Sequence, residues 1–426
     1  MQLGGRRVSI EPEHVIYANN AFDQLAGAVK EISPGKSCTV VMDTRTREVA
    51  GRHICMDLRD AALSVSEVIV PDRDRGRSPA CDEATYHSLL ETIGEVEVIV
   101  SVGSGVINDL CKWSAYTKGV RYIAVATAAS MNGYTSANVA AAINGVKVLE
   151  RSRPPKAVFS TPELITGAPY ELTASGLGDI AAKTVSSTDW YLNHVLFGDE
   201  FIRESVDLTI DVEPLYMDHG ELIRAKEDQA IEALFHGLML TGAAMTMAGT
   251  SAPASGGEHL VSHALDMMST IRGVEHDLHG RQVGVGTIIT AELYRRLLAL
   301  ESPVWDQERA TVKDFGFWES MSGPVAEIYA PKAHRIGAAV QWLRSGDWDS
   351  LRETLSEMVR PPEDLKNCFR MAGAAHRAED IRCSREYLLE AFLHCHEMRA
   401  RFTVVDMAWL AGLLPGCAAE IVEAFA

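Results

Sequence analysis

Histidines gather in one part of this chain. Four of its 14 histidines fall between positions 259 and 279, beside glycine-rich turns. His259 and His263 are four residues apart, so a helix would carry both imidazoles on one face. Together with the carboxylate of Asp179, which ends the segment Gly176-Leu-Gly-Asp179, such residues can supply a carboxylate and two imidazoles to a divalent metal. A histidine pair at this spacing is commonly a hydrogen-bonded feature of a protein core. The metal site is favoured because several histidines, an aspartate and glycine-rich turns occur together.

This metal would use nitrogen and oxygen ligands, because the chain has no cysteine between Cys111 and Cys368. Zinc, nickel and iron(II) all accept imidazole and carboxylate ligands. We expect one divalent ion, with zinc as the first choice and nickel or iron as alternatives. Because three protein ligands leave open positions, the ion would polarise a substrate carbonyl or lower the pKa of a bound alcohol.

A glycine loop is the second feature that could carry chemistry. An apolar run over residues 97–102 is followed by Gly103-Ser104-Gly105 and then by a helical pattern. Glycines let the backbone approach a ligand closely, and the helix N-terminus presents free N–H groups that suit a pyrophosphate. The same Gly-x-Gly pattern also serves ordinary strand-to-helix turns.

Polar side chains end two other expected strands. Asp43 could accept hydrogen bonds from an adenosine ribose, and Thr127 and Ser130 place hydroxyls at the C-terminal edge of the sheet, where open α/β sheets bind ligands. In the alternative interpretation, Asp43 caps a helix and the two hydroxyls belong to ordinary turns.

The elements that must position these residues change in kind near residue 165. Before it, β-rich runs at 38–43, 65–70, 96–102, 122–126 and 157–159 alternate with helical patterns at 81–93 and 106–116, which predicts a parallel α/β sheet. After it come helical segments, at 171–192, 227–247, 259–268, 283–300, 332–343 and 384–397. We therefore expect a nucleotide-binding α/β domain over 1–165 and an all-α domain over 166–426.

The amino-acid composition limits the classes of molecule that we expect this chain to bind. The formal net charge is −18 and the sequence has no basic block, so we expect neither nucleic-acid nor membrane binding, and any bound phosphate should be small. Eight scattered cysteines without a CxxC pair suit reduced thiols. The first 30 residues do not resemble a signal peptide. A cytoplasmic protein is the expectation.

Five motifs occur in an order that resembles one family. They are Gly103-Ser-Gly-Val-Ile-Asn-Asp109, Ala126-Thr-Ala-Ala-Ser-Met-Asn-Gly-Tyr-Thr-Ser136, Gly176-Leu-Gly-Asp179, Ser255-Gly-Gly-Glu-His-Leu-Val-Ser-His263 and His279-Gly-Arg-Gln-Val-Gly-Val-Gly286. The chain resembles glycerol-1-phosphate dehydrogenases over about residues 15–415, and its Met398–Asp406 segment is similar to the C-terminal Arg-Tyr-Thr helix of that family. The resemblance implies a dehydroquinate-synthase-like architecture within the metal-containing alcohol dehydrogenase superfamily, with a Rossmann-like NAD(P)-binding domain and a helical metal- and substrate-binding domain.

Site roles follow from the same resemblance. It implies that the cofactor pyrophosphate lies on Gly103, Ser104, Gly105, Val106 and Ile107, and that the rest of NAD(P) contacts Asp43, Thr127, Ala128, Ala129, Ser130 and Ser136. It further implies that Asp179, His259 and His279 bind the metal. His263 would touch the substrate or relay its proton, and Asp179 would also lie beside the substrate. The implied reaction is hydride transfer from NAD(P)H to the C2 carbonyl of dihydroxyacetone phosphate, giving sn-glycerol 1-phosphate.

One position departs from the family pattern. The family reads Ser-Met-Asp-Gly-Tyr, with its aspartate on the substrate, whereas this chain has Asn132 there. The amide removes a charge and adds a donor, which could favour a substrate with an extra oxygen or could be neutral. Asp43 favours NAD by repelling a 2′-phosphate, while Arg45 and Arg47 could offset that repulsion.

Other functions remain open at this stage. They are a dehydrogenase of another polyol or of a phosphate or phosphonate ester, a cyclase of the dehydroquinate-synthase type that retains NAD, and a homologue that binds nucleotide without turnover. Net formation of NAD+ separates the dehydrogenases from the cyclase, and metal retention argues against the inactive homologue. We expect a small phosphorylated substrate and a homo-oligomer, a dimer or larger.

Overall fold

The computed structural model describes residues 2–3, 6–7, 11–310 and 313–426. It divides into two compact units that are not contiguous in sequence. The first unit comprises Met1–Gly176, Asp211–Leu215 and Lys226–Thr250, and the second comprises Leu177–Ile210, Tyr216–Ala225 and Ser251–Ala426. This division differs from a single boundary near residue 165, because the first unit extends to Gly176 and includes a helix from the later part of the chain.

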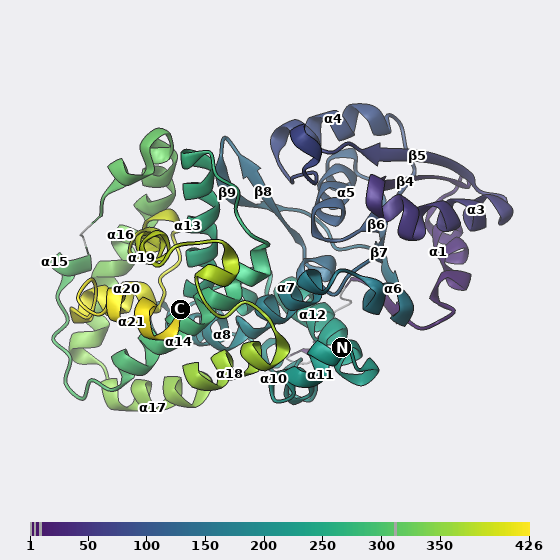
Figure 1. The fold of residues 1–426 in the computed structure, drawn as a ribbon. Coiled ribbons are helices and arrows are strands. Elements are labelled where there is room, and N and C mark those ends of the chain that lie inside the picture. The colour runs from purple at the N-terminus through teal and green to yellow at the C-terminus, as the bar shows by residue number, and fades with distance from the viewer. Residues whose placement is uncertain (1, 4–5, 8–10, 311–312) are drawn as a thin grey trace. The chain divides into compact units, whose positions relative to one another are not determined.

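A six-stranded parallel sheet forms the centre of the first unit (Figure 1). Its order is β3-β10-β7-β6-β4-β5, and every neighbouring pair is parallel. The strands are β3 His14–Tyr17, β4 Ser37–Asp43, β5 Ser64–Val70, β6 Val98–Gly103, β7 Arg121–Ala126 and β10 Ala157–Ser160. All six residues of β6 are buried, as expected for a parallel strand that is covered on both faces.

Helices cover both faces of this sheet. Because crossovers between parallel strands are right-handed, the face on which a helix lies depends on the direction in which the chain moves along the sheet to the next strand. Apolar residues of α1 Leu25–Ile32 and α3 Arg52–Asp60 share one core cluster with the sheet. Helices α4 Glu83–Ile93 and α5 Gly105–Lys118 contact each other, consistent with a place on the opposite face. Apart from strands β8 and β9, the remaining elements before residue 169 are β1 Gln2–Leu3, β2 Arg6–Arg7, α2 Thr44–Thr46, α6 Pro162–Gly167, the 3₁₀ helices η1 Ala21–Gln24, η3 Asp74–Gly76 and η4 Gly133–Thr135, and the π-helix η2 Arg47–Gly51.

A hairpin that the sequence pattern did not predict extends from the first unit. Strands β8 Asn138–Ile143 and β9 Val146–Arg151 pair in antiparallel fashion. The two residues that join them, Asn144 and Gly145, have φ values of 50° and 78°. Positive φ at both positions is the geometry of a type I′ turn, whose twist matches that of the flanking strands.

Helix α12 Asp228–Ala248 belongs to the first unit although it lies late in the chain. Thr135 donates to the carbonyl of Met239, and Thr246 donates to the carbonyl of Thr135. In the part of the chain that the structure describes, α12 is the one helix long and apolar enough to cross a membrane, and 67% of its most apolar window is buried inside the structure. This burial is typical of a core helix in a globular protein.

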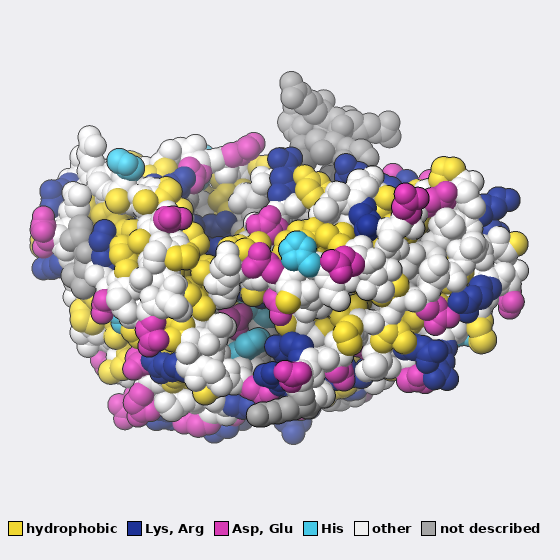
Figure 2. Space-filling model, turned by 90° about the horizontal axis from the view of Figure 1, so that it is seen from above, with side chains coloured by type: hydrophobic (Ala, Val, Ile, Leu, Met, Phe, Trp, Pro, Cys, Tyr) yellow, Lys and Arg dark blue, Asp and Glu magenta, His cyan; other side chains and the backbone are white. Residues whose placement is uncertain are grey.

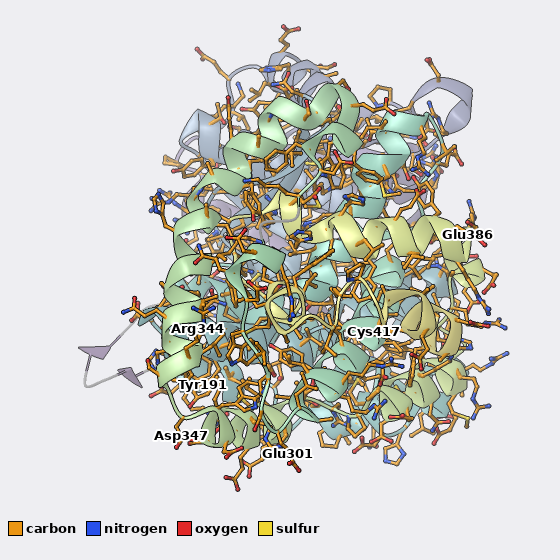
Figure 3. The ribbon with its side chains drawn as sticks, turned by 90° about the vertical axis from the view of Figure 1, so that its left-hand side faces the viewer. Tyr191, Glu301, Arg344, Asp347, Glu386 and Cys417 are labelled. Carbon is orange, nitrogen blue, oxygen red and sulfur yellow. The ribbon has the colours of Figure 1, made fainter. Side chains whose placement is uncertain are left out.

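The second unit is helical, with the later helices facing the viewer in Figure 3. Its helices after residue 182 are α8 Lys183–Phe197, α9 Arg203–Asp207, α11 Gly220–Ala225, α13 Gly257–Arg272, α14 His279–Leu298, α15 Gln307–Ala310, α16 Ser322–Ser345, α17 Trp348–Met358, α18 Pro362–Ala372, α19 Arg385–His394, α20 Val404–Ala411 and α21 Ala418–Phe425. Its short turns are η5 Ala252–Ala254, η6 Phe315–Met321, η7 Glu379–Ile381 and η8 Cys395–Met398. Helices α7 Tyr170–Ala181 and α10 Glu213–Met217 run across the division between the units. The expected α/β and helical parts are confirmed.

Surface and cysteine chemistry agree with the composition. Acidic and basic side chains are interspersed on the face shown in Figure 2. All eight cysteines are free thiols, among them Cys417, which is labelled in Figure 3. Burial raises the pKa of the Cys55 thiol to about 12, so this side chain is a poor nucleophile at neutral pH.

Candidate active site

Three side chains of the second unit form a potential metal site. One ligand atom from each of Asp179, His259 and His279 lies within 4.8 Å of the others. Asp179 is 2% exposed and His259 is 5% exposed, and His259 Nε2 lies 3.5 Å from an Asp179 carboxylate oxygen. The structure therefore brings together the three residues that the sequence motifs selected. One carboxylate and two imidazoles suit zinc, nickel or iron(II) and leave coordination positions for a substrate.

Close helix packing places these ligands. A Cβ on Gly178 would lie 2.0 Å from the Gly280 carbonyl oxygen, so α7 can approach α14 this closely only with glycine at that position. Asp179 and His279 are the chain neighbours of these two glycines. Likewise a Cβ on Gly286 would lie 2.6 Å from the backbone oxygen of Glu258, so α14 also packs against the first turn of α13. The glycines of the sequence motifs thus set the spacing of the three candidate ligands.

Hydrogen bonds orient both imidazoles. His259 Nδ1 lies 2.7 Å from a Glu258 carboxylate oxygen, which accepts its proton and leaves Nε2 available to a metal. His279 Nδ1 lies 3.1 Å from the Ser262 hydroxyl, and that hydroxyl donates to Gln282. Because the Ser262 proton goes to Gln282, His279 Nδ1 must be the donor, and its Nε2 is also left for a metal. The sequence motifs contain Glu258, Ser262 and Gln282, but nothing in the pattern assigned them a role.

The electrostatic potential at this site is negative. Burial alone would lower the pKa of His259, but hydrogen bonds to Asp179 and Glu258 outweigh it and raise the pKa to about 9. An imidazole held between two carboxylates lies where a cation is favoured. The donor set and the local charge therefore both fit a divalent metal.

Replacing Glu258 with glutamine is expected to weaken metal binding by about 10- to 100-fold, as loss of an outer carboxylate does at histidine metal sites. The amide keeps the shape of the side chain but accepts the His259 proton less strongly. A competition titration with a chromophoric chelator measures the change. Glu386→Gln, at an exposed position of α19 labelled in Figure 3, is the matched control. Equal metal affinity in the two variants would contradict the assigned role.

His263 lies beside this cluster. Its ring centroid is 5.9 Å from that of His259 and 5.6 Å from that of His279. Arg399 Nη2 lies 3.3 Å from His263 Nδ1. Arginine can only donate, so Nδ1 of His263 accepts and the ring carries its proton on Nε2. In this tautomer His263 can donate a hydrogen bond from Nε2 to an oxygen atom.

A buried carboxylate supports the start of α13. Asp189 accepts hydrogen bonds from the Tyr294 hydroxyl at 2.6 Å and from the backbone N–H groups of Gly257 and Val404, both at 2.8 Å. Asp189 is 0% exposed, and it fixes the first residue of the helix that carries Glu258 and the two histidines. Sequence reasoning missed this residue, because its partners are far apart in the chain.

The glycine loop of the first unit has the geometry expected for a phosphate site. Gly103 ends β6, and α5 begins at Gly105 after Ser104. A Cβ on Gly103 would lie 2.5 Å from the Ile107 Cβ, so the strand and helix can meet only with glycine here. The first N–H groups of a helix have no partner within it. The backbone at Gly105, Val106 and Ile107 can therefore offer them to a phosphate.

The neighbouring polar residues occupy different environments. Thr127 and Ser130 are each 7% exposed and follow β7, and the intervening Ala128 and Ala129 are fully buried. The Ser136 hydroxyl is 3.1 Å from the carbonyl oxygens of Gly133 and Asn138, to which it donates, and it accepts from Lys112. Its position is thus set by contacts within the protein. Asn132 is 8% exposed at the start of η4.

Asp43 caps a helix in this structure. Its carboxylate accepts from the backbone N–H groups of Arg45 at 2.9 Å and Thr46 at 2.7 Å. The Arg45 guanidinium makes two bonds to Asp72, at 2.8 and 3.1 Å. Arg45 Nη1 also lies 3.7 Å from an Asp43 carboxylate oxygen, so two carboxylates share one guanidinium at the end of β4.

Comparisons with known proteins identify relatives of this chain. Residues 16–169 match the family model described as iron-containing alcohol dehydrogenase. A relative from Bacillus velezensis, named an NAD(P)+ glycerol-1-phosphate dehydrogenase, is 30% identical over 404 residues, with 94% of this chain and 92% of the relative covered. A relative of the same name from Thermococcus kodakarensis is 33% identical over 306 residues, covering 72% of this chain and 82% of its own. The solved NADH-dependent butanol dehydrogenase A of Thermotoga maritima shares the fold, with a TM-score of 0.59 at 14% identity over 95% of this chain and 98% of that one.

Proposed function

This chain belongs to the glycerol-1-phosphate dehydrogenase family, and on that premise we propose that it reduces dihydroxyacetone phosphate with NAD(P)H to sn-glycerol 1-phosphate. The observation that carries the proposal is the buried cluster of Asp179, His259 and His279. Its nitrogen and oxygen donors, oriented by hydrogen bonds, fit a catalytic divalent metal, for which we propose zinc, with iron or nickel as alternatives.

The protein supplies positioning and a hydrogen-bond donor to the reacting oxygen. A bound divalent metal would supply Lewis-acid polarisation of the C2 carbonyl, and NAD(P)H would supply the hydride. Asp179, His259 and His279 would hold the metal, and Asp179 would also lie beside the substrate. His263 carries a proton on Nε2, because Arg399 donates to its Nδ1. Through this N–H the ring would hydrogen-bond to the developing alkoxide, and a proton from solvent would complete the alcohol, so that C2 gains a hydride and its oxygen gains a proton.

The cofactor would bind on the first unit. Backbone N–H groups at the start of α5 would hold the pyrophosphate, close to Thr127 and Ser130 at the end of the neighbouring strand β7. We propose a preference for NADH, because Asp43 and Asp72 share the single Arg45 guanidinium, which leaves net negative charge where an adenosine ribose would lie.

Asp43→Asn tests this preference without removing the helix cap, since the amide oxygen still accepts from the backbone. The ratio of kcat/KM for NADH to that for NADPH is expected to fall by about tenfold, as a like-charge contact with the 2′-phosphate disappears. Initial rates at varied cofactor concentration give the ratio. An unchanged ratio would place the ribose elsewhere.

Initial rates of NADH and NADPH oxidation test the reaction itself. Metal-loaded protein is assayed with dihydroxyacetone phosphate, with dihydroxyacetone and with a chelator added. The proposal predicts chelator-sensitive turnover of the phosphate ester and net formation of NAD(P)+. Because Asn132 replaces the aspartate of the family, faster turnover of another polyol or ester would assign the chain a different substrate. Turnover without net NAD(P)+ would indicate the cyclase reaction.

A further inference from the structure

Two arginines on the segment after η8 form no ion pair in the described part of the chain. Arg399 and Arg401 are both half-buried, and Glu258 and Asp189 attract only Arg401, from beyond ion-pair distance. Two other buried cations are neutralised by carboxylates: Lys332 lies 3.1 Å from Asp406, and Lys112 lies 3.3 Å from Asp109. A poorly solvated positive charge without a counter-ion is costly, so this pair marks a place for an anion.

The two arginines differ in how their donors are used. Arg401 donates to the Ser255 carbonyl and, at 3.0 Å, to the Ser251 hydroxyl, so it is held by the protein. For Arg399 the structure records one hydrogen bond, the 3.3 Å contact with His263, and most of its five N–H groups stay available. Burial lowers the pKa of the Arg399 guanidinium to about 10, and repulsion by Arg401 adds to this.

Arg399 is separated from the metal cluster by one imidazole. His263, which it contacts, has its ring centroid 5.6 Å from that of the metal-binding residue His279. In dihydroxyacetone phosphate the phosphorus is three bonds from the carbonyl carbon, so a substrate whose carbonyl lies at these ligands would extend its phosphate toward the guanidinium. The planar fork of arginine also matches a phosphate in geometry as well as in charge.

We infer that Arg399 binds the phosphate of the substrate and so selects phosphorylated over unphosphorylated ketones. The inference rests on the proposed function and adds a specificity residue to it. Arg401 adds positive charge to that of Arg399. One N–H group of Arg399 sets the tautomer of His263, and its other N–H groups would bind the phosphate.

The test compares Arg399→Gln and Arg399→Lys with the wild type, using NADH, which has no 2′-phosphate. For Arg399→Gln, kcat/KM for dihydroxyacetone phosphate is expected to fall about 10²- to 10³-fold, as when a buried charge pair loses one partner. Turnover of dihydroxyacetone should fall far less, because that substrate loses only the contact of Arg399 with His263 and no charge pair. For Arg399→Lys, kcat/KM for dihydroxyacetone phosphate should be about tenfold higher than for Arg399→Gln, since lysine keeps the charge but not the planar fork of donors. Arg272→Gln, at an exposed ion pair with Glu390, is the control.

The outcomes separate this inference from the proposed function. Equal losses with both substrates, at unchanged metal content, would mean that Arg399 acts only through His263 and would overturn the inference. No loss would overturn it too. If the wild type does not reduce dihydroxyacetone phosphate, the proposed function fails, and calorimetric titration of metal-loaded protein with inorganic phosphate then decides. If the wild type binds phosphate and Arg399→Gln does not, the anion site is supported. If both bind phosphate equally, the anion site is refuted.

Discussion

Replacing His259 with alanine is expected to abolish stable metal binding and to lower kcat by at least about 10³-fold, since the lost Lewis acid contributes several kcal/mol to the transition state. His259 is central to the cluster because it contacts both Asp179, at 3.5 Å, and Glu258, at 2.7 Å. Metal content by mass spectrometry, together with the rate of NADH oxidation, measures both effects. The affinity for NADH should stay the same, because the phosphate loop belongs to the other unit.

His276 provides the matched control for this substitution. It lies three residues before His279, but its side chain is 49% exposed and pairs with Asp266 instead of joining the cluster. His276→Ala should keep the metal and the activity. If both histidine variants kept the metal, or both lost it, the assignment of Asp179, His259 and His279 as the ligands would be wrong.

Replacing Gly103 with alanine is expected to have the opposite pattern, with lost cofactor binding and intact metal. The new methyl would lie 2.5 Å from the Ile107 Cβ, so the start of α5 must move. Overpacking of this kind costs about 1–3 kcal/mol, which corresponds to about a 10- to 100-fold rise in the Kd for NADH. Fluorescence titration with NADH measures the Kd, and metal analysis shows that the second unit is intact.

Gly27→Ala is the control for a glycine-to-alanine change in the same unit. It lies in α1, and a Cβ there would meet no atom within 4 Å. This substitution should leave NADH binding unchanged and slightly stabilise the helix. An equal effect of the two substitutions, or none from Gly103→Ala, would remove the loop from the cofactor site.

The strands of the parallel sheet could be predicted because each is a short apolar run between turn signals. The expected runs at 38–43, 65–70 and 122–126 differ from β4, β5 and β7 by one residue at the N-terminal end. The family resemblance is likewise confirmed, as ordered glycine and histidine motifs are visible without a structure. The hairpin β8–β9 was missed, although Asn144–Gly145 is a typical hairpin turn.

Hydrophobic periodicity could not predict packing between segments that are far apart in the sequence. The sequence placed α12 with the other helices, but Gly242 of that helix packs so tightly on η4 that a Cβ would lie 2.1 Å from the Thr135 hydroxyl. Nothing local to residues 228–248 reveals that partner. The same reason explains the site: spacing and motif order selected His259 and His279, whereas Glu258, Asp189 and Arg399 gain their roles from contacts with distant residues.

The stereochemistry of the product tests the central claim most directly. Dihydroxyacetone phosphate is reduced by the metal-loaded protein with NADH, and the glycerol phosphate formed is analysed with enantiomer-specific enzymes or by chiral chromatography. The account predicts sn-glycerol 1-phosphate as the sole enantiomer, formed in equal amount to NAD+. Formation of sn-glycerol 3-phosphate, or NADH oxidation without any glycerol phosphate, would contradict it.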